Sequence, residues 1–143
     1  MKNVSNTYIE LISLSVFNTG IIVLCAPDKE ELFANITKLY GKVGFTKKIA
    51  AEDVQKLKSI CGDDLLNTPG QTVQADDGSD VFMLFQTDDP SNVALEYIVH
   101  ETHHAAYMVC DHLGIEDEEC EAYLQEYIFK CIVESFNNIN NKN

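Results

Sequence analysis

Residues 81–114 read VFMLFQTDDPSNVALEYIVHETHHAAYMVCDHLG, and this stretch decides the class of fold. The run VFMLFQ at 81–86 is almost wholly apolar and short, which predicts a buried strand. The residues DDPS at 88–91 favour a helix start, and apolar residues then recur at helical spacing as far as Leu113, before Gly114. The stretch therefore predicts a buried strand followed by a long helix over about residues 90–113.

The sequence on either side extends this pattern in both directions. Alternating apolar residues around a turn at 18–20 predict a hairpin over residues 7–25, and a second hairpin is expected from 71–75 and 81–86 around the turn at 76–79. Helical spacing predicts helices over 28–40 and 51–60, and a last one from about 117 to 136. We expect a single α+β domain over residues 1–136 with a β-rich N-terminal half, followed by a frayed Asn-rich tail at 137–143.

The charge and the cysteine content narrow the classes of function. The 143 residues carry 10 Lys plus Arg and 23 Asp plus Glu, a formal net charge of −13 that would repel a phosphate backbone and that favours a basic partner or a bound cation. The longest apolar segment, 11–25, is interrupted by polar residues and glycine at 18–20, so no membrane-spanning helix is expected. No signal peptide is expected either, because Glu10 stands where its apolar region should begin. The five cysteines are widely spaced without a CxxC, which indicates small buried residues in a reducing compartment, and hence a cytoplasmic protein.

The pattern HETHH at 100–104 carries the candidate chemistry. Positions i and i+4 of a helix project from one face, so His100 and His104 can offer two imidazole nitrogens to one ion. Glu101 lies one position further round, where a carboxylate can act on a water held by the metal without itself being a ligand. The adjacent His103 is rotated by about 100° from His104 and is expected not to be a ligand. The spacing therefore predicts a zinc site suited to hydrolysis.

With its second acidic helix, this pattern resembles the gluzincin metallopeptidases, and most closely the small ImmA/IrrE-like and phage-encoded ones. In that family the HExxH helix supplies two ligands and the base, and a Glu in an ExxA pattern on the next helix supplies the third ligand. The segment EDEECEAYLQEYI contains such a pattern, beginning at Glu119, and the resemblance covers about residues 80–136. It implies a small zincin-like domain holding Zn²⁺ through His100, His104 and Glu119. It also implies that the strand at 81–86 lines the cleft and pairs with an extended substrate. Tyr123 stands where the family often has Asp or Asn.

The sequence leaves two assignments at this site open: the third zinc ligand and the oxyanion donor. Helix geometry places His104 level with about Glu126 rather than Glu119 if the two helices pack antiparallel, so Glu126 is the alternative third ligand. Three side chains are candidate donors to an oxyanion: Tyr123, Tyr107 and His112. We select Glu119 as ligand and Tyr123 as donor. Cys110 and Cys120 are expected to be buried structural residues rather than ligands.

These observations support a zinc-dependent metallopeptidase that acts on a peptide or protein, with Glu101 as the base. An alternative of a different class is a noncatalytic, zinc-stabilised acidic protein that binds a basic partner, such as a phage accessory inhibitor. A third is a metal-dependent hydrolase of nonpeptide substrates, which would use the same residues. The presence of Glu101 favours an enzyme, because a structural zinc site needs no base.

Overall fold

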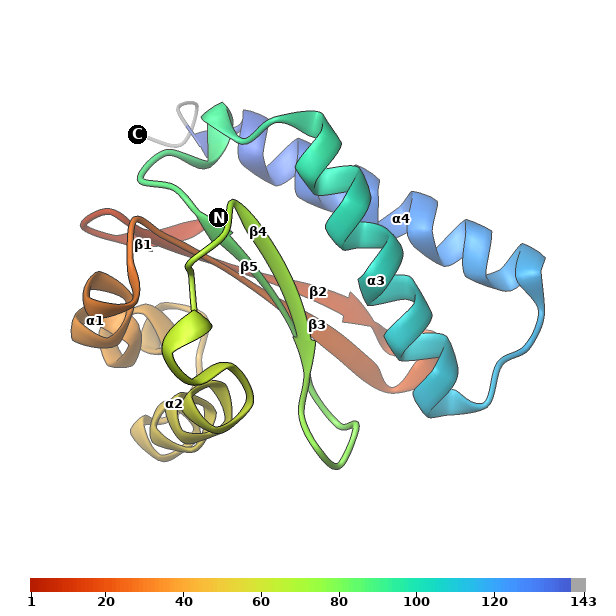
Figure 1. The fold of residues 1–143 in the computed structure, drawn as a ribbon, viewed down its shortest axis with the longest axis horizontal. Coiled ribbons are helices and arrows are strands. Elements are labelled where there is room, and N and C mark those ends of the chain that lie inside the picture. Colours follow the sequence, from red (N-terminus) through yellow and green to blue (C-terminus); the bar gives the residue numbers. More distant parts are fainter. Residues whose placement is uncertain (140–143) are drawn as a thin grey trace.

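A mixed five-stranded sheet organises the computed structural model, which describes residues 1–139 (Figure 1). The described residues form four α-helices and five strands, as expected for an α+β chain. The elements are β1 (Lys2–Val4), β2 (Thr7–Leu14), β3 (Thr19–Ala26), α1 (Lys29–Lys42), α2 (Lys47–Cys61), β4 (Gly70–Gln74), β5 (Val81–Gln86), α3 (Leu95–Leu113) and α4 (Glu118–Asn137). The predicted tail at 137–143 begins with the last residue of α4, and residues 140–143 lie outside the described residues.

The strand order is β1-β2-β3-β5-β4, with β3 and β5 parallel and every other neighbouring pair antiparallel. Both predicted hairpins are present, as β2–β3 and β4–β5. The connection from β3 to β5 carries α1, α2 and β4, so β5 enters the middle of the sheet. Its first five residues are all buried, as the apolar run predicted.

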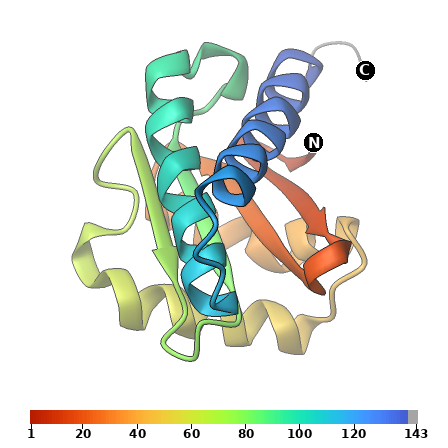
Figure 2. The ribbon, with the colours of Figure 1, turned by 90° about the vertical axis from the view of Figure 1, so that its right-hand side faces the viewer.

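Two pairs of helices cover the two faces of this sheet (Figures 1 and 2). Side chains of β5 alternate between them: Met83 and Phe85 pack in the cluster formed with α3 and α4, whereas Phe82 and Leu84 pack in the cluster formed with α1 and α2. Each face is therefore shielded by its own apolar layer. Among residues 1–139, no helix combines the length and the apolar character needed to cross a membrane.

Local side-chain chemistry sets where the helices begin and end. Thr46 accepts a hydrogen bond from the N–H of Ile49, so α2 begins at Lys47 and not at the predicted Ala51. Residues Pro90–Asn92 form a separate 3-10 turn capped by Asp89, so α3 begins at Leu95 instead of 90. Gly114, at a φ of 70°, ends α3 in the left-handed conformation that the sequence predicted for it.

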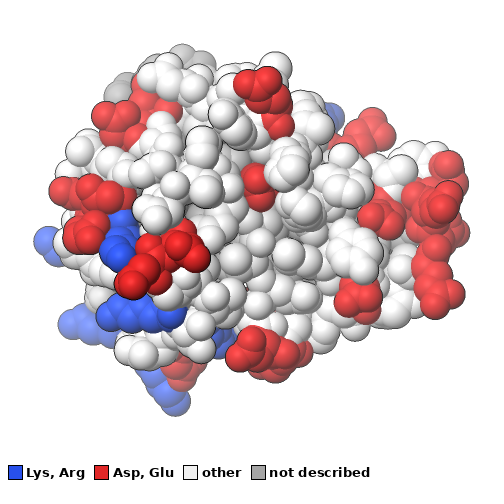
Figure 3. Space-filling view, viewed as in Figure 1, with Lys and Arg blue, Asp and Glu red and all other residues white. Residues whose placement is uncertain are grey.

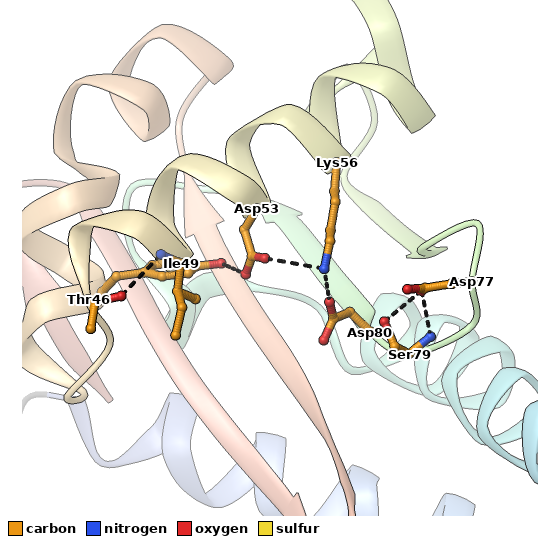
Figure 4. A network of polar contacts seen from close by, with 8 residues as sticks. Thr46, Ile49, Asp53, Lys56, Asp77, Ser79 and Asp80 are labelled. Carbon is orange, nitrogen blue, oxygen red and sulfur yellow. Dashed lines mark hydrogen bonds and ion pairs between the residues drawn. The ribbon is translucent and has the colours of Figure 1, made fainter.

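A partly buried polar network joins α1, α2 and the β4–β5 turn (Figure 4). The hydroxyl of Tyr40 donates a hydrogen bond of 2.7 Å to Asp53, whose side chain is almost inaccessible. Lys56 lies 3.9 Å from Asp53 and also pairs with Asp80. Burial is the largest cause that raises the pKa of the Asp53 carboxyl, and it outweighs the opposing effects of Tyr40 and Lys56.

This raised pKa makes stability depend on pH. The folded protein holds the Asp53 proton more tightly than the unfolded chain does. The stabilisation that protonated Asp53 gives to the folded state is therefore fully present below the pKa of the unfolded state, and it is lost as the pH rises through the pKa of the folded state. We expect Asp53→Asn, which cannot ionise, to gain stability relative to the parent as the pH is raised. Urea unfolding of both proteins across the acidic to neutral range measures this difference. The exposed Glu52→Gln on the same helix is the control, and a difference that stays constant with pH would contradict the prediction.

Candidate metal centre

The two histidines of the pattern project together from the solvent side of α3. The Nε2 atoms of His100 and His104 are 3.2 Å apart, and their ring centroids are separated by 4.8 Å. Both side chains are exposed, with 67% of the His100 side chain accessible. The i, i+4 spacing therefore produces the pair that the sequence predicted.

This separation can be compared with what a metal requires. Two imidazole nitrogens at the usual zinc distance of about 2.0–2.1 Å, in tetrahedral arrangement, lie about 3.3 Å apart. The observed 3.2 Å between Nε2 atoms agrees with this value. His100 and His104 thus fit two ligand positions of one ion.

Glu101 lies beneath the pair and is almost completely buried, with 5% of its surface accessible. The hydroxyl of Thr72, on β4, lies 2.9 Å from Oε1 of Glu101 and 3.2 Å from its main-chain oxygen. The other carboxylate oxygen, Oε2, is 3.9 Å from Nε2 of His100. One carboxylate oxygen is therefore anchored to the sheet while the other faces the imidazole pair.

Gly70, at the start of β4, makes room for this carboxylate. A Cβ atom at position 70 would lie 2.8 Å from Cγ of Glu101 and 3.2 Å from its Oε2. Contacts this short do not occur in folded proteins unless a neighbouring group moves. The buried Glu101 side chain therefore has room only if residue 70 is glycine.

We expect Gly70→Ala to displace Glu101 and to reduce the free energy of unfolding by about 1–3 kcal/mol, the usual range for overpacking. Chemical denaturation of parent and variant measures this loss. Gly41→Ala is the matched control, because nothing lies within 4 Å of a Cβ at that helical position. That control should gain about 0.5–1 kcal/mol from helix propensity. Equal stability of Gly70→Ala and the parent would contradict the close approach.

The structure corrects the expected role of the strand at 81–86. This strand, β5, is hydrogen-bonded to β3 on one side and to β4 on the other, so it cannot pair with a substrate. The strand at the edge of the sheet and next to Glu101 is β4. Sequence alone predicted both strands but not which of them lies at the edge, because the order of strands in a sheet depends on the connections between them and not on a local pattern.

The main chain of β4 has no neighbouring strand along this edge, where the carbonyl oxygen of Gly70 accepts a hydrogen bond from the hydroxyl of Thr68. The N–H of Ala75 donates to Asp80 and the N–H of Gln86 donates to Pro69, so residues 69 and 75 direct their main-chain groups toward β5. Because these directions alternate along a strand, the main-chain groups of Gly70, Thr72 and Gln74 face outward. Edge groups of this kind can pair with an extended peptide.

Helix α4 contacts a different side of α3 from the one that bears the pair. His103 lies 3.4 Å from Gln125 of α4, and Val99 and Thr102 line a shallow groove with Ala122, Gln125, Glu126 and Phe129. Glu119 lies nearer the turn, in the exposed first turn of α4, where its N–H bonds to Asp117. Residues near 99–103 of α3 are thus level with residues 122–129 of α4, as the antiparallel geometry predicted.

No group of three or more His, Cys, Asp or Glu side chains able to hold a metal is present within residues 1–139. The structure brings together His100, His104 and Glu101, but it does not bring Glu119 or Glu126 into a three-ligand set with them. Glu119 as the third ligand stays a prediction, and the packing of α3 and α4 gives it no support.

Since the helix packing brings neither Glu119 nor Glu126 to the histidine pair, we expect Glu119→Gln and Glu126→Gln each to bind zinc within about threefold of the parent. Loss of a metal ligand's hydrogen-bond partner alone would already weaken zinc binding by about 10–100-fold. Isothermal titration with zinc measures both affinities. A large loss in Glu119→Gln alone would support the motif and would require the first turn of α4 to move. A large loss in Glu126→Gln alone would identify Glu126 as the ligand.

The three candidate oxyanion donors have different surroundings. Tyr123 lines an apolar cavity with Val16 and Phe17, next to the β2–β3 connection, and 68% of its surface is accessible. The His112 ring lies against Gly78 of the β4–β5 turn. Tyr107 is three residues beyond His104 on the same helix, which makes it the candidate that shares a face with the pair. The structure therefore does not bring Tyr123 to Glu101.

The cysteines follow the sequence interpretation in part. All five are free; Cys25, Cys61 and Cys110 are buried, whereas Cys120 and Cys131 are half-buried. Burial raises the pKa of the Cys110 thiol, with a smaller contribution from Cys120 on α4. The burial of Cys110 is what a small structural residue of the core would show.

Two residues of this site, Gly70 and Thr72, are absent from the sequence prediction. They lie about 30 positions before Glu101, and their role depends on α3 packing over β4. The only local signal is the Pro69–Gly70 pair, which indicates the start of a strand but not which residue that strand contacts.

Comparison with protein families, with curated proteins and with solved structures finds no match to the chain.

Proposed function

We propose that the chain is a metal-dependent hydrolase of the HExxH type, a zincin-like metallopeptidase whose centre consists of His100, Glu101 and His104. The observation that carries this proposal is the arrangement of the three side chains: two Nε2 atoms 3.2 Å apart, with a buried carboxylate oxygen 3.9 Å from one of them. A noncatalytic zinc site needs no general base, so a buried carboxylate that faces the imidazole pair favours a hydrolytic one.

Each residue has a distinct role in this proposal. His100 and His104 would hold Zn²⁺, which when bound acts as a Lewis acid toward water and toward a carbonyl group. Glu101 accepts a proton at its free Oε2, and Thr72 fixes the orientation of the carboxylate through Oε1. Burial of Glu101 between α3 and β4 keeps bulk water away from most of the carboxylate.

The edge of β4 supports a peptide as the substrate. An extended peptide pairing with the outward groups of Gly70, Thr72 and Gln74 would run directly beside Glu101, since Thr72 bonds to that residue. Small esters or other nonpeptide substrates would make no use of this edge.

We also propose that the protein is cytoplasmic, which its five free cysteines support.

Incubation of the zinc-loaded protein with a mixture of unstructured peptides, followed by mass spectrometry, tests this function. We expect cleavage within the peptides that disappears when a chelator is added. The variant His103→Ala serves as the control, because His103 contacts Gln125 of α4 and is not a member of the pair. Absence of cleavage in all zinc-loaded samples would contradict the proposed activity.

A further inference from the structure

Strand β2 has an open edge on the side of the sheet opposite β4. The short strand β1 pairs only with Thr7, Tyr8 and Ile9, while β3 pairs along β2 as far as Leu14. Residues 10–14 of β2 therefore have a strand neighbour on one side only. This region is separate from the proposed hydrolytic site, because β2 and β4 lie toward opposite ends of the strand order.

The close approach of Gly20 on β3 to Ile12 on β2 shows which main-chain groups of β2 face the open edge. A Cβ built on Gly20 would lie 3.1 Å from the carbonyl oxygen of Ile12, so this carbonyl faces β3. The directions alternate along a strand, and the main-chain N–H and C=O groups of Leu11 and Ser13 therefore face the open side. Two donors and two acceptors are thus presented to a further strand.

A groove runs beside this edge, between β2 and α4. One of its two adjoining cavities is apolar and is lined by Leu14, Val16, Phe17, Tyr123, Leu124 and Tyr127. Val16 is 90% accessible and Tyr127 48%, so this apolar surface is uncovered in the single chain. Exposed apolar surface of this kind, next to an open strand edge, is typical of a site that binds another polypeptide.

The second cavity gives the groove a negative charge. It continues along β2 and α4, shares Ser13 and Tyr127 with the first, and has the carboxylates of Glu10 and Glu134 in its lining. Glu10 lies 3.2 Å from the ammonium group of Met1, so Glu134 is the carboxylate of this lining on which the proposal relies.

The distribution of lysine reinforces this charge. The lysines lie mainly on α1 and α2, whereas Asp and Glu gather at the end of the molecule where α4 begins (Figure 3). Seven of the ten basic residues fall within positions 29–58: Lys29, Lys38, Lys42, Lys47, Lys48, Lys56 and Lys58. An approaching basic segment would therefore be attracted toward the α4 side of the molecule.

We propose that this groove binds an extended, basic segment of a partner protein, which adds as a strand to residues 11–14 of β2. Apolar side chains of the segment occupy the cavity beside Val16 and Tyr127, and a Lys or Arg faces Glu134. The proposal does not depend on the hydrolytic function, because none of these residues belongs to the His100–Glu101–His104 centre.

A labelled peptide of sequence KTVTVTKT, which as an extended strand presents two Lys and two Val on the same face, is the probe, and fluorescence anisotropy measures its binding to the full chain. Val16→Asp places a charge in the apolar cavity at an almost fully exposed position, and Glu134→Lys reverses the charge of the second cavity. We expect each variant to weaken binding by about fivefold or more. Glu52→Lys, on α2, makes the same charge change at an exposed position outside the groove and should bind within about twofold of the parent.

Two further readouts separate strand addition from general electrostatic attraction. A copy of the peptide with alternate amides N-methylated keeps its charge but loses the hydrogen-bond donors of one edge, so we expect it to bind much more weakly. Hydrogen exchange should slow at the N–H groups of Leu11 and Ser13 when the unmodified peptide binds. Equal binding of both peptides, or of parent and groove variants, would overturn the proposal. Self-association of the protein without peptide binding would overturn it too, since the groove would then join copies of this chain.

Discussion

Replacing Glu101 by glutamine is expected to lower peptide hydrolysis by about 10²–10⁴-fold while leaving zinc binding almost unchanged, which corresponds to the loss of a general base. The amide is nearly isosteric with the carboxylate and can still accept the hydrogen bond from Thr72, which lies 2.9 Å from Oε1. It cannot accept a proton at the position of Oε2. The rate of peptide cleavage and the zinc affinity, measured on the same preparation, separate the two roles.

The control for this variant is Thr72→Val, which keeps the shape of the side chain and removes the hydroxyl. Since Thr72 only orients the carboxylate, its loss should reduce the rate less than Glu101→Gln does. If Glu101→Gln cleaves peptides as fast as the parent, Glu101 is not the base and the proposed mechanism fails.

Loss of either histidine is expected to have the second largest effect. Zinc at a concentration 100 times its dissociation constant should stabilise the parent by about 2.7 kcal/mol, because the ion binds only the folded chain. If His100→Ala or His104→Ala weakens binding tenfold or more, the same zinc concentration stabilises the variant by at most about 1.4 kcal/mol. Urea unfolding with and without zinc measures the difference.

His103→Ala is the matched control, because it removes an imidazole from the same segment but lies beside Gln125 of α4. It should retain nearly all of the zinc-induced stabilisation. If all three variants gain as much stability from zinc as the parent, the metal binds elsewhere on this acidic chain.

Much of the fold could be predicted from local patterns. The buried strand β5, both hairpins and the four helices follow from apolar periodicity and from capping residues such as Asp28, Asp117 and Gly114. The three-residue strand β1 was not predicted, because Lys2, Asn3 and Val4 are too few to show a period. The parallel pairing of β3 with β5 depends on how the α1–α2 connection crosses the sheet, which no local pattern encodes.

Only part of the candidate site could likewise be predicted from local patterns. The pair His100 and His104 depends only on the repeat of one helix, so the spacing alone predicted it. Contacts between elements were beyond local reasoning: the support of Glu101 by Thr72 and Gly70 needs the packing of α3 over β4. The placement of Glu119 likewise depends on how α3 and α4 cross, and here the geometric argument from helix length described the crossing better than the motif did.

X-ray absorption at the zinc edge of the metal-loaded protein tests the central claim most directly. We expect about one zinc per chain, with two imidazole nitrogens at about 2.0–2.1 Å and oxygen or nitrogen atoms in the remaining positions. The imidazole signal should be lost in the double variant His100→Ala/His104→Ala. Sulfur ligands at about 2.3 Å, or a zinc spectrum that is the same in the parent and in the double variant, would contradict a metal centre at His100 and His104.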